Sequence, residues 1–123
     1  MKVSGRALRL SIFVCEGDTW RHKPLHAEIV HRAHRAGLAG ATVVRGIEGY
    51  GSTSAIHTAH LLPIGDRLPL LIVIVDAEQR IRDFLPQLDE LDISGLVTLD
   101  EVDVVRYVPG ETAHSRHRDR RSG

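Results

Sequence analysis

The sequence predicts an α+β fold in which two helices cover one face of a four-stranded antiparallel sheet. Three observations predict it. Two segments have the residue spacing of amphipathic helices, and four have the alternation or continuous hydrophobicity of strands. These segments follow one another in the order strand–helix–strand–strand–helix–strand. A chain of 123 residues also has room for one domain of this kind and little more.

The first strand and the first helix are predicted from two different periods. Residues 7–14 (ALRLSIFV) alternate apolar with other residues, which is typical of a half-buried strand. Pro24 suits the first turn of a helix, where its missing N–H costs nothing, and Gly37 is a suitable C-terminal stop. Between them, apolar residues recur at helical spacing at Leu25, Ile29, Ala33 and Ala36.

The middle of the chain predicts two strands joined by a long connection. Residues 41–50 (ATVVRGIEGY) begin with β-branched residues, and their glycines indicate a bulge or a close backbone approach. Residues 52–67 show no sustained period and are expected to form a loop, partly extended over residues 56–62. So long a connection in a compact domain indicates a functional role. Residues 68–75 (LPLLIVIV) are continuously apolar, as in a central strand.

The last third predicts a second helix and a final strand. Asp76 and Gln79 have the spacing of a capping box, and Pro86 is expected to kink the helix or to split off its last turn. Helical spacing continues through Ile81, Phe84, Leu85, Leu88 and Leu91. Residues 96–107 (LVTLDEVDVVRY) then predict the fourth strand.

This order of elements is that of a ferredoxin-like βαββαβ sandwich. We expect residues 1–110 to form the domain and residues 111–123, which lack large apolar side chains, to form a disordered basic tail. Both helices would cover the same face of the sheet, although the strands are apolar on both faces. The uncovered face therefore predicts a homo-oligomer.

Composition excludes several classes of protein. Lys and Arg together number 16, as do Asp and Glu, so we expect no dedicated nucleic-acid binding. The single cysteine, Cys15, cannot form an internal disulfide. The longest apolar run is too short to span a bilayer, and no secretory leader precedes the first strand. We expect a soluble, cytoplasmic protein.

Residues that could carry chemistry are few and incomplete. The glycine-rich residues 46–51 (GIEGYG) match neither a Walker loop nor a dinucleotide fingerprint, and a glycine bulge at a strand end explains them better. Histidine pairs occur at His31/His34 and His57/His60, whereas zinc needs three or four ligands. A triad of Ser52 or Ser54, His57 and Asp66 would have no nucleophile elbow. We therefore expect no enzymatic activity and no metal site.

Three stretches taken together carry a family resemblance: AGLAGATVVRGIEGYGSTSAIHT, RLPLLIVIVDAEQRI and GLVTLDEVDVVRY. With them, the chain resembles the PII-like signalling superfamily, and most closely its branch called domain of unknown function 190. The resemblance covers about residues 8–108. It implies a trimer of ferredoxin-like subunits, which agrees with the uncovered sheet face.

The resemblance also implies a function and a site. In PII proteins small effectors, typically adenine nucleotides, bind in clefts between subunits and order a loop that engages a partner protein. Residues 52–67 would be that loop, with the partner-facing residues Ser52, Ile56, His57 and Thr58. Arg106 would meet phosphate across the interface. The other ligand-binding residues implied are Gly40, Ala41 and Thr42 at the turn into the second strand and Gly49, Tyr50 and Gly51 at the loop root.

The chain departs from the PII pattern at three places. The glycine- and lysine-rich phosphate segment is replaced by residues 91–95 (LDISG), and Val108 stands where a second basic residue is expected. The loop has no tyrosine for modification. A small anionic effector therefore stays the prediction, with an adenine nucleotide as one candidate and its identity open. No cofactor is certain.

Two further expectations follow from the resemblance. Genes of this branch often lie beside fluoride-exporter genes, which implies a membrane transporter as a partner. The leading hypothesis is thus a non-enzymatic, trimeric PII-like regulator. The alternative is a trimeric divalent-metal-binding protein of CutA type, which shares the fold, with His57, His60 and Cys15 as its first ligands to test.

Overall fold

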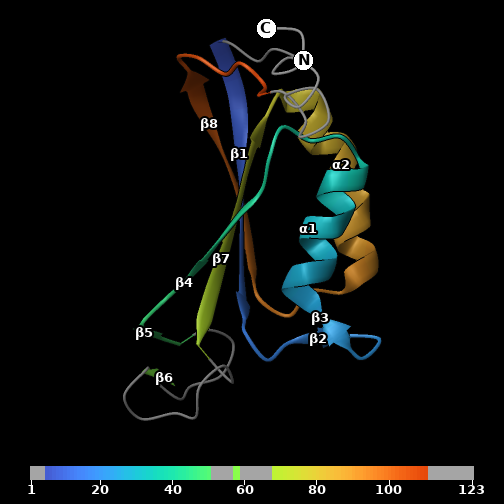
Figure 1. The fold of residues 1–123 in the computed structure, drawn as a ribbon, viewed down its shortest axis with the longest axis vertical. Helices are drawn as coiled ribbons and strands as arrows, with labels where there is room; N and C mark the ends of the chain where they lie inside the picture. The colour runs from blue at the N-terminus through green and yellow to red at the C-terminus, as the bar shows by residue number, and fades with distance from the viewer. Residues whose placement is uncertain (1–4, 51–56, 59–67, 111–123) are drawn as a thin grey trace, which may run out of the picture.

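The computed structural model describes residues 5–50, 57–58 and 68–110, and it confirms the predicted α+β sandwich (Figure 1). Its main elements are β1 (Gly5–Cys15), α1 (Leu25–Arg35), β4 (Thr42–Arg45), β7 (Pro69–Asp76), α2 (Glu78–Leu91) and β8 (Leu96–Val104). Four two-residue strands pair two by two: β2 (Thr19–Trp20) with β3 (Lys23–Pro24), and β5 (Glu48–Gly49) with β6 (His57–Thr58). Residues 111–123, the expected tail, lie outside the described part.

The sheet has the strand order β4-β7-β1-β8, and every neighbouring pair is antiparallel. β1 and β7 are central, while β4 and β8 form the two edges. Both helices lie on the same face (Figure 1). The prediction of two helices on one face of a four-stranded antiparallel sheet is therefore confirmed.

The core lies between this sheet face and the helices. The even-numbered residues from Leu8 to Val14 of β1 and from Leu70 to Asp76 of β7 point towards the helices and are buried, because side chains alternate between the two faces of a strand. The helices contribute apolar residues at helical spacing to the same core. The largest side chains completely buried there are Leu10, Ile12, Ile29, Ile72, Ile74, Ile81 and Phe84.

The opposite sheet face is open in the single chain. Phe13 on β1 and Leu96 on β8 are register partners on this face, and they are 41% and 57% exposed. Val44 on the β4 edge is 51% exposed. A monomeric protein rarely leaves a run of large apolar side chains in water, so this face suits burial against another chain.

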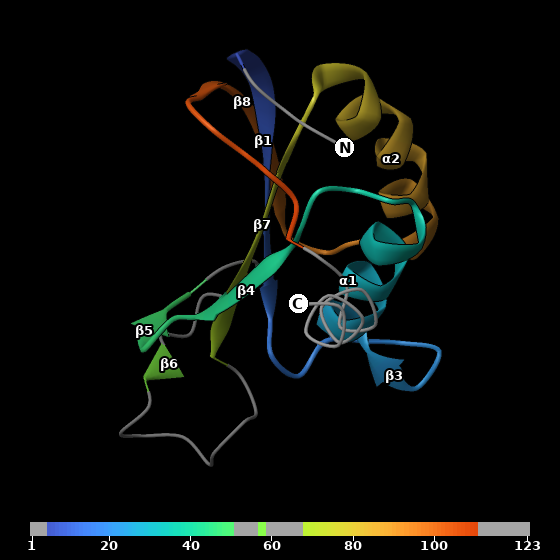
Figure 2. The same cartoon turned by 45° about the horizontal axis from the view of Figure 1, so that its top comes forward.

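Two strands are shorter than the sequence predicts. β4 ends at Arg45 rather than at Tyr50, because Gly46 donates its N–H to the Pro69 carbonyl (2.7 Å) and the strand breaks there. A Cβ atom at Gly46 would lie only 2.7 Å from the Pro69 ring, so the close approach requires glycine. β8 ends at Val104, and the following segment turns back towards the connection between α1 and β4 (Figure 2).

The second helix also differs from its prediction. The capping box is wrong: the residue at the N-cap is Ala77, no side chain caps the helix, and Gln79 instead donates to Asp83. Pro86 lies inside a helix that continues to Leu91. Packing of the apolar face sustains the helix, because tertiary contacts outweigh the loss of one backbone hydrogen bond.

A hairpin that the sequence analysis missed connects β1 to α1. Its turn places Arg21 and His22 in the left-handed region (φ 49° and 68°). Trp20 lies between the guanidinium groups of Arg21 and Arg32, 4.6 and 4.8 Å from the ring centre. Arg32 also donates to Glu28 (2.8 Å), and this hydrogen bond lowers the pKa of Glu28 below its ordinary 4.5. It raises the pKa of Arg32 in turn.

We predict that Gly95→Ala destabilises the domain. A Cβ atom there would lie 2.2 Å from the Phe13 carbonyl oxygen, so the start of β8 would have to move away from β1. The expected loss is about 1–3 kcal/mol in the free energy of unfolding, measured by urea denaturation. Gly40→Ala is the matched control, since a Cβ atom there meets nothing within 4 Å. Equal stability of the two variants would contradict the prediction.

Candidate ligand-binding site

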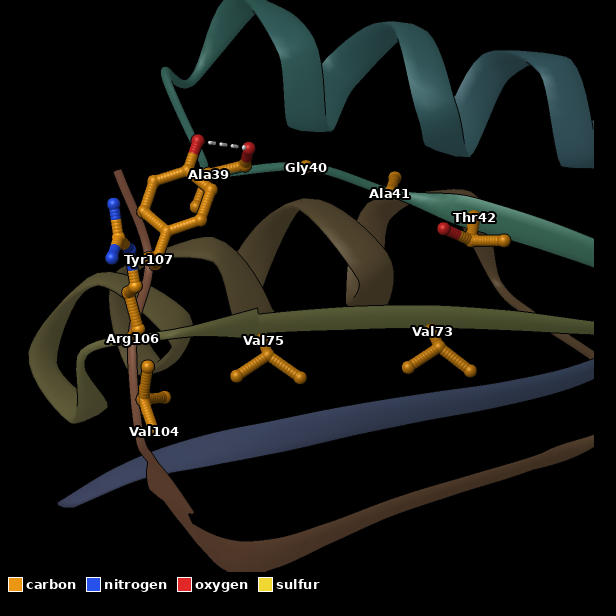
Figure 3. Close-up of a pocket in the computed structure, with 9 residues that line it drawn as sticks. All are labelled: Ala39, Gly40, Ala41, Thr42, Val73, Val75, Val104, Arg106 and Tyr107. Atoms are coloured by element: carbon orange, nitrogen blue, oxygen red, sulfur yellow. Dashed lines mark hydrogen bonds between the residues drawn. The ribbon is translucent and has the colours of Figure 1, made fainter. Parts of the chain in front are cut away.

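A pocket of about 430 Å³ lies at one end of the open sheet face (Figure 3). Residues 39–42, which lead into β4, form one wall. Val73 and Val75 of β7 form the floor, and Val104 with Arg106 and Tyr107 forms the opposite wall. The volume is in the range of small-molecule sites, roughly 300–1,000 Å³.

A buried carboxylate holds the first wall in place. Asp76, at the end of β7, has no exposed surface, and its Oδ2 accepts the N–H of Ala39 (2.9 Å) and the Nε–H of Arg80 (3.2 Å). Its Oδ1 accepts the N–H of Ala77 (2.7 Å). Arg80 also donates to the Gly37 carbonyl. One carboxylate thus joins the sheet, the start of α2 and the connection that enters β4.

The second wall is attached to the first through Tyr107. Its hydroxyl donates to the Ala39 carbonyl (2.9 Å), as the dashed line in Figure 3 shows. Both backbone polar groups of Ala39 are therefore used, the N–H by Asp76 and the carbonyl by Tyr107. These two hydrogen bonds hold Gly40, which follows Ala39, in place relative to Arg106, which precedes Tyr107.

The chemistry of the pocket combines an apolar floor with one cation. Val73 and Val75 offer a flat apolar surface, and β4 is an edge strand whose outward N–H and C=O groups have no partner strand in the described chain. Arg106 is the only charged residue of the lining, and it forms no ion pair with any residue that the structure describes. The arrangement suits a small ligand with an aromatic or apolar part and an anionic group.

The structure brings four of the residues singled out from the sequence together in this pocket: Gly40, Ala41, Thr42 and Arg106. Arg106 lies beside the turn of its own chain, whereas the sequence analysis placed it across an interface. The analysis missed Tyr107, Val73 and Val75. In the sequence the two valines only indicate a buried strand. The contribution of Tyr107 to the pocket wall depends on its hydrogen bond to Ala39, which is distant in sequence.

The residues of the loop root lie elsewhere. Tyr50 lines a second pocket of about 370 Å³, together with Phe13, Cys15, Ser94 and Leu96 among others. This pocket is at the other end of the open face, beside Pro69. Val75 and Pro69 are six residues apart on β7, which is roughly 20 Å along a strand. Gly49 is next to Tyr50, with φ 158°, and Gly51 lies outside the described residues.

The expected partner loop falls mostly on residues that are not described. Ser52 and Ile56 belong to these, while His57 and Thr58 form β6 and pair with Glu48 and Gly49 of β5. Within residues 5–50, 57–58 and 68–110, no group of three or more His, Cys, Asp or Glu side chains could hold a metal ion. His60 lies outside that part, so the CutA-type alternative stays a prediction. Neither described helix is long and apolar enough to cross a membrane.

Comparison with solved structures defines the class of protein. A structure of CPII, a nitrogen regulatory PII-like protein from Thiomonas intermedia K12, matches 82% of this chain and 90% of its own, with a TM-score of 0.61 and 23% identity. That structure contains ADP, AMP and bicarbonate. A second structure of CPII, bound to ADP and bicarbonate, matches with a TM-score of 0.54 and 21% identity. The fold is that of the PII-like proteins.

Sequence comparison gives the family within this class. The family model of domain of unknown function 190, described as “Uncharacterized ACR”, matches residues 7–104. A UPF0166 protein of Aquifex aeolicus is 38% identical over 96 residues, which are 78% of this chain and 90% of that protein. A UPF0166 protein of Methanocaldococcus jannaschii is 32% identical over 87% of this chain and 96% of its own. The chain belongs to the family of domain of unknown function 190.

We predict that Asp76→Asn loosens the pocket and destabilises the fold. The Asn side chain is neutral, so it no longer pairs with the charge of Arg80. Its one NH₂ group cannot accept a hydrogen bond, so it would face either the N–H of Ala39 or that of Ala77 without binding it. The expected loss is about 1–3 kcal/mol in the free energy of unfolding, measured by urea denaturation. Asp83→Asn, on the exposed side of α2, is the control and should change stability little. Identical midpoints for the two variants would refute the role assigned to Asp76.

Proposed function

We propose that the protein is a non-enzymatic PII-like regulator. It binds a small anionic effector of the adenine-nucleotide class in clefts between the subunits of a homotrimer, and it signals to a partner through residues 52–67. The observation that carries the proposal is Arg106, a cation that forms no ion pair with the described residues and lies beside an apolar floor and the edge of residues 40–42.

The pocket offers each part of such an effector a partner. A purine ring has two apolar faces and a polar rim, so it can lie on Val73 and Val75 while its rim meets backbone groups of Gly40 and Ala41. Phosphate oxygens accept paired N–H groups from a guanidinium, which Arg106 provides. The presence of ADP and AMP in the structures of CPII supports the same class of ligand.

The two pockets support a site shared between subunits. In one chain they lie at opposite ends of the open face and cannot contact the same small molecule. A ring of subunits joined head to tail brings one end of a subunit against the other end of the next. Such a ring also buries the exposed side chains Phe13, Val44 and Leu96. Arg106 and Tyr50 of neighbouring subunits would then face a common cleft.

The lining of both pockets favours binding over catalysis. Among the described residues that line the two pockets there is no His, Asp, Glu or Lys to act as a general base. Nucleophilic catalysis needs such a base within hydrogen-bonding distance. A regulator needs only a ligand that binds two conformations with different affinity.

The path from pocket to partner runs along β4. Thr42 lines the pocket, and the same strand leads through Arg45 and β5 to the segment 51–67. An effector that changes the position of β4 would change the root of this segment, and effector and partner must then influence each other's affinity equally. We propose a membrane transporter, such as a fluoride exporter, as that partner, following the resemblance of the sequence.

Complementation between two variants tests the shared cleft. Gly40→Val places a branched side chain into the first pocket, and Tyr50→Ala removes the aromatic ring of the second. Each variant alone should lose AMP binding in isothermal titration calorimetry. Co-expressed and purified together, they should recover about a quarter of the wild-type sites, because mixed rings combine an intact half from each chain.

Native mass spectrometry is the control for assembly and should give three copies for every variant. Recovery of no sites in a mixed trimer would show that both pockets do not serve one ligand. A stable monomer would contradict the inter-subunit site altogether.

A further inference from the structure

We infer that a groove between α2 and β8 is a docking site for a basic amphipathic helix of the membrane partner. The groove has a volume of about 500 Å³ and shares no lining residue with the two pockets of the open face. The choice of a membrane transporter as the source of this helix rests on the proposed function, whereas the chemistry of the groove does not. The inference gives the partner a second contact besides residues 52–67.

The floor of the groove is apolar because the helices leave the edge strand β8 partly uncovered. Val97 of β8 is the register partner of Ile12, and Leu99 is that of Leu10, so these side chains face the helices. The two β1 residues are completely buried. By contrast, Val97 is 39% exposed and Leu99 is only partly buried. The helical layer therefore covers β1 and stops short of the edge, where a further helix would complete it.

One wall of the groove is a ridge along α2. Leu85, Leu88 and Asp89 recur at helical spacing, and Asp92, the C-cap residue, continues the same stripe. The ridge is about two turns, or roughly 10 Å, long. A helix that binds in a groove also presents its anchoring side chains every three or four residues. A second helix lying along this ridge therefore suits the shape of the groove.

The rim of the groove is acidic at the C-terminal end of α2. Asp89 and Asp92 line it, and neither forms an ion pair with a residue in the described part of the chain. The carbonyl groups at a helix C-terminus carry partial negative charge, which favours Lys or Arg nearby. The last turn of α2 has no basic residue. An occupant with Lys or Arg at this end and apolar side chains over Val97 and Leu99 would match both parts.

The position of the groove favours the partner as the source of this helix. Leu96 directly precedes Val97, and it lines the second pocket together with Tyr50, which directly precedes the segment 51–67. A protein that binds residues 52–67 can therefore reach the groove around the edge of β8. Cytoplasmic loops of membrane proteins carry an excess of Lys and Arg, so a transporter offers the required charge. The basic residues 111–123 of the chain itself lack large apolar side chains for the floor.

Binding of a synthetic helix tests the groove. The probe is a fluorescently labelled peptide of about 14 residues, with leucine on one face and lysine on the other. It is titrated with the full-length protein at constant ionic strength, and its fluorescence anisotropy is measured. Asp89→Asn/Asp92→Asn should weaken binding at least about fivefold, because the rim loses both charges. Asp83→Asn/Asp103→Asn removes two exposed carboxylates outside the groove, and this matched control should bind like the wild type.

A second pair of variants tests the apolar floor. Val97→Thr should weaken binding of the peptide about threefold, because a hydroxyl replaces one methyl group against the leucine face. Val105→Thr is the matched control, since that side chain is 95% exposed and lies outside the groove.

Three outcomes would overturn the inference. The first is no binding of the leucine–lysine helix to the wild type. The second is equal binding of a leucine–glutamate helix, which would show that the charge of the rim does not select the occupant. The third is that the groove variants and their controls bind the peptide equally.

Two measurements separate the partner from other occupants. Replacing the four arginines within residues 116–121 by glutamine should leave the affinity for the peptide unchanged. A gain of about fivefold or more would instead identify the chain's own C-terminal segment as the occupant. Native mass spectrometry should give the same number of subunits for Asp89→Asn/Asp92→Asn and the wild type. A different number would make the groove an interface between copies of the chain.

The peptide titration needs neither an adenine nucleotide nor the cleft shared between subunits. If the peptide does not bind while the complementation succeeds, the proposed regulator stands and the docking groove is wrong. If the complementation fails while the peptide binds as expected, the groove stands and the shared cleft is wrong.

Discussion

The buried carboxylate of Asp76 is the interaction on which the geometry of the first pocket depends. It ends a central strand, lies two residues before the start of α2 and accepts the N–H of Ala39. A carboxylate without solvent contact needs several donors, and here two backbone groups and one guanidinium supply them. The requirement to satisfy this one buried group thus fixes three parts of the chain against each other. The position of the turn at Gly40, which lines the first pocket, is a consequence of that requirement.

The two faces of the sheet have separate functions. One face holds the helices and almost all of the buried apolar side chains, so it supplies the stability of the domain. The other keeps its large apolar groups exposed and has a pocket at each end. Because the helices do not line these two pockets, substitutions in the pockets can leave the packing of the core intact.

Sequence patterns predicted the parts of the fold that depend on local periodicity, and they missed those that depend on distant contacts. The alternation in β1 and the apolar run of β7 follow from burial, so both strands were predicted within a few residues. The early end of β4 follows from a hydrogen bond between Gly46 and Pro69, which no local pattern contains. The spacing of Asp76 predicted a helix cap, whereas in the structure its side chain holds the turn 37 residues earlier. In the candidate site, the family resemblance pointed to Arg106. The position of Tyr107 could be seen only in the folded chain, where its hydroxyl donates to the Ala39 carbonyl.

The place of Trp20 gives the protein a built-in optical probe. It is the only tryptophan of the chain, and its indole ring lies between two guanidinium groups. One of them, that of Arg32, also joins α1 to α2 through Glu90. Its fluorescence therefore reports on the packing of the helical layer. The ring lines neither of the two open-face pockets. Loss of helix packing and occupation of the cleft should consequently give different optical signals in the unlabelled protein.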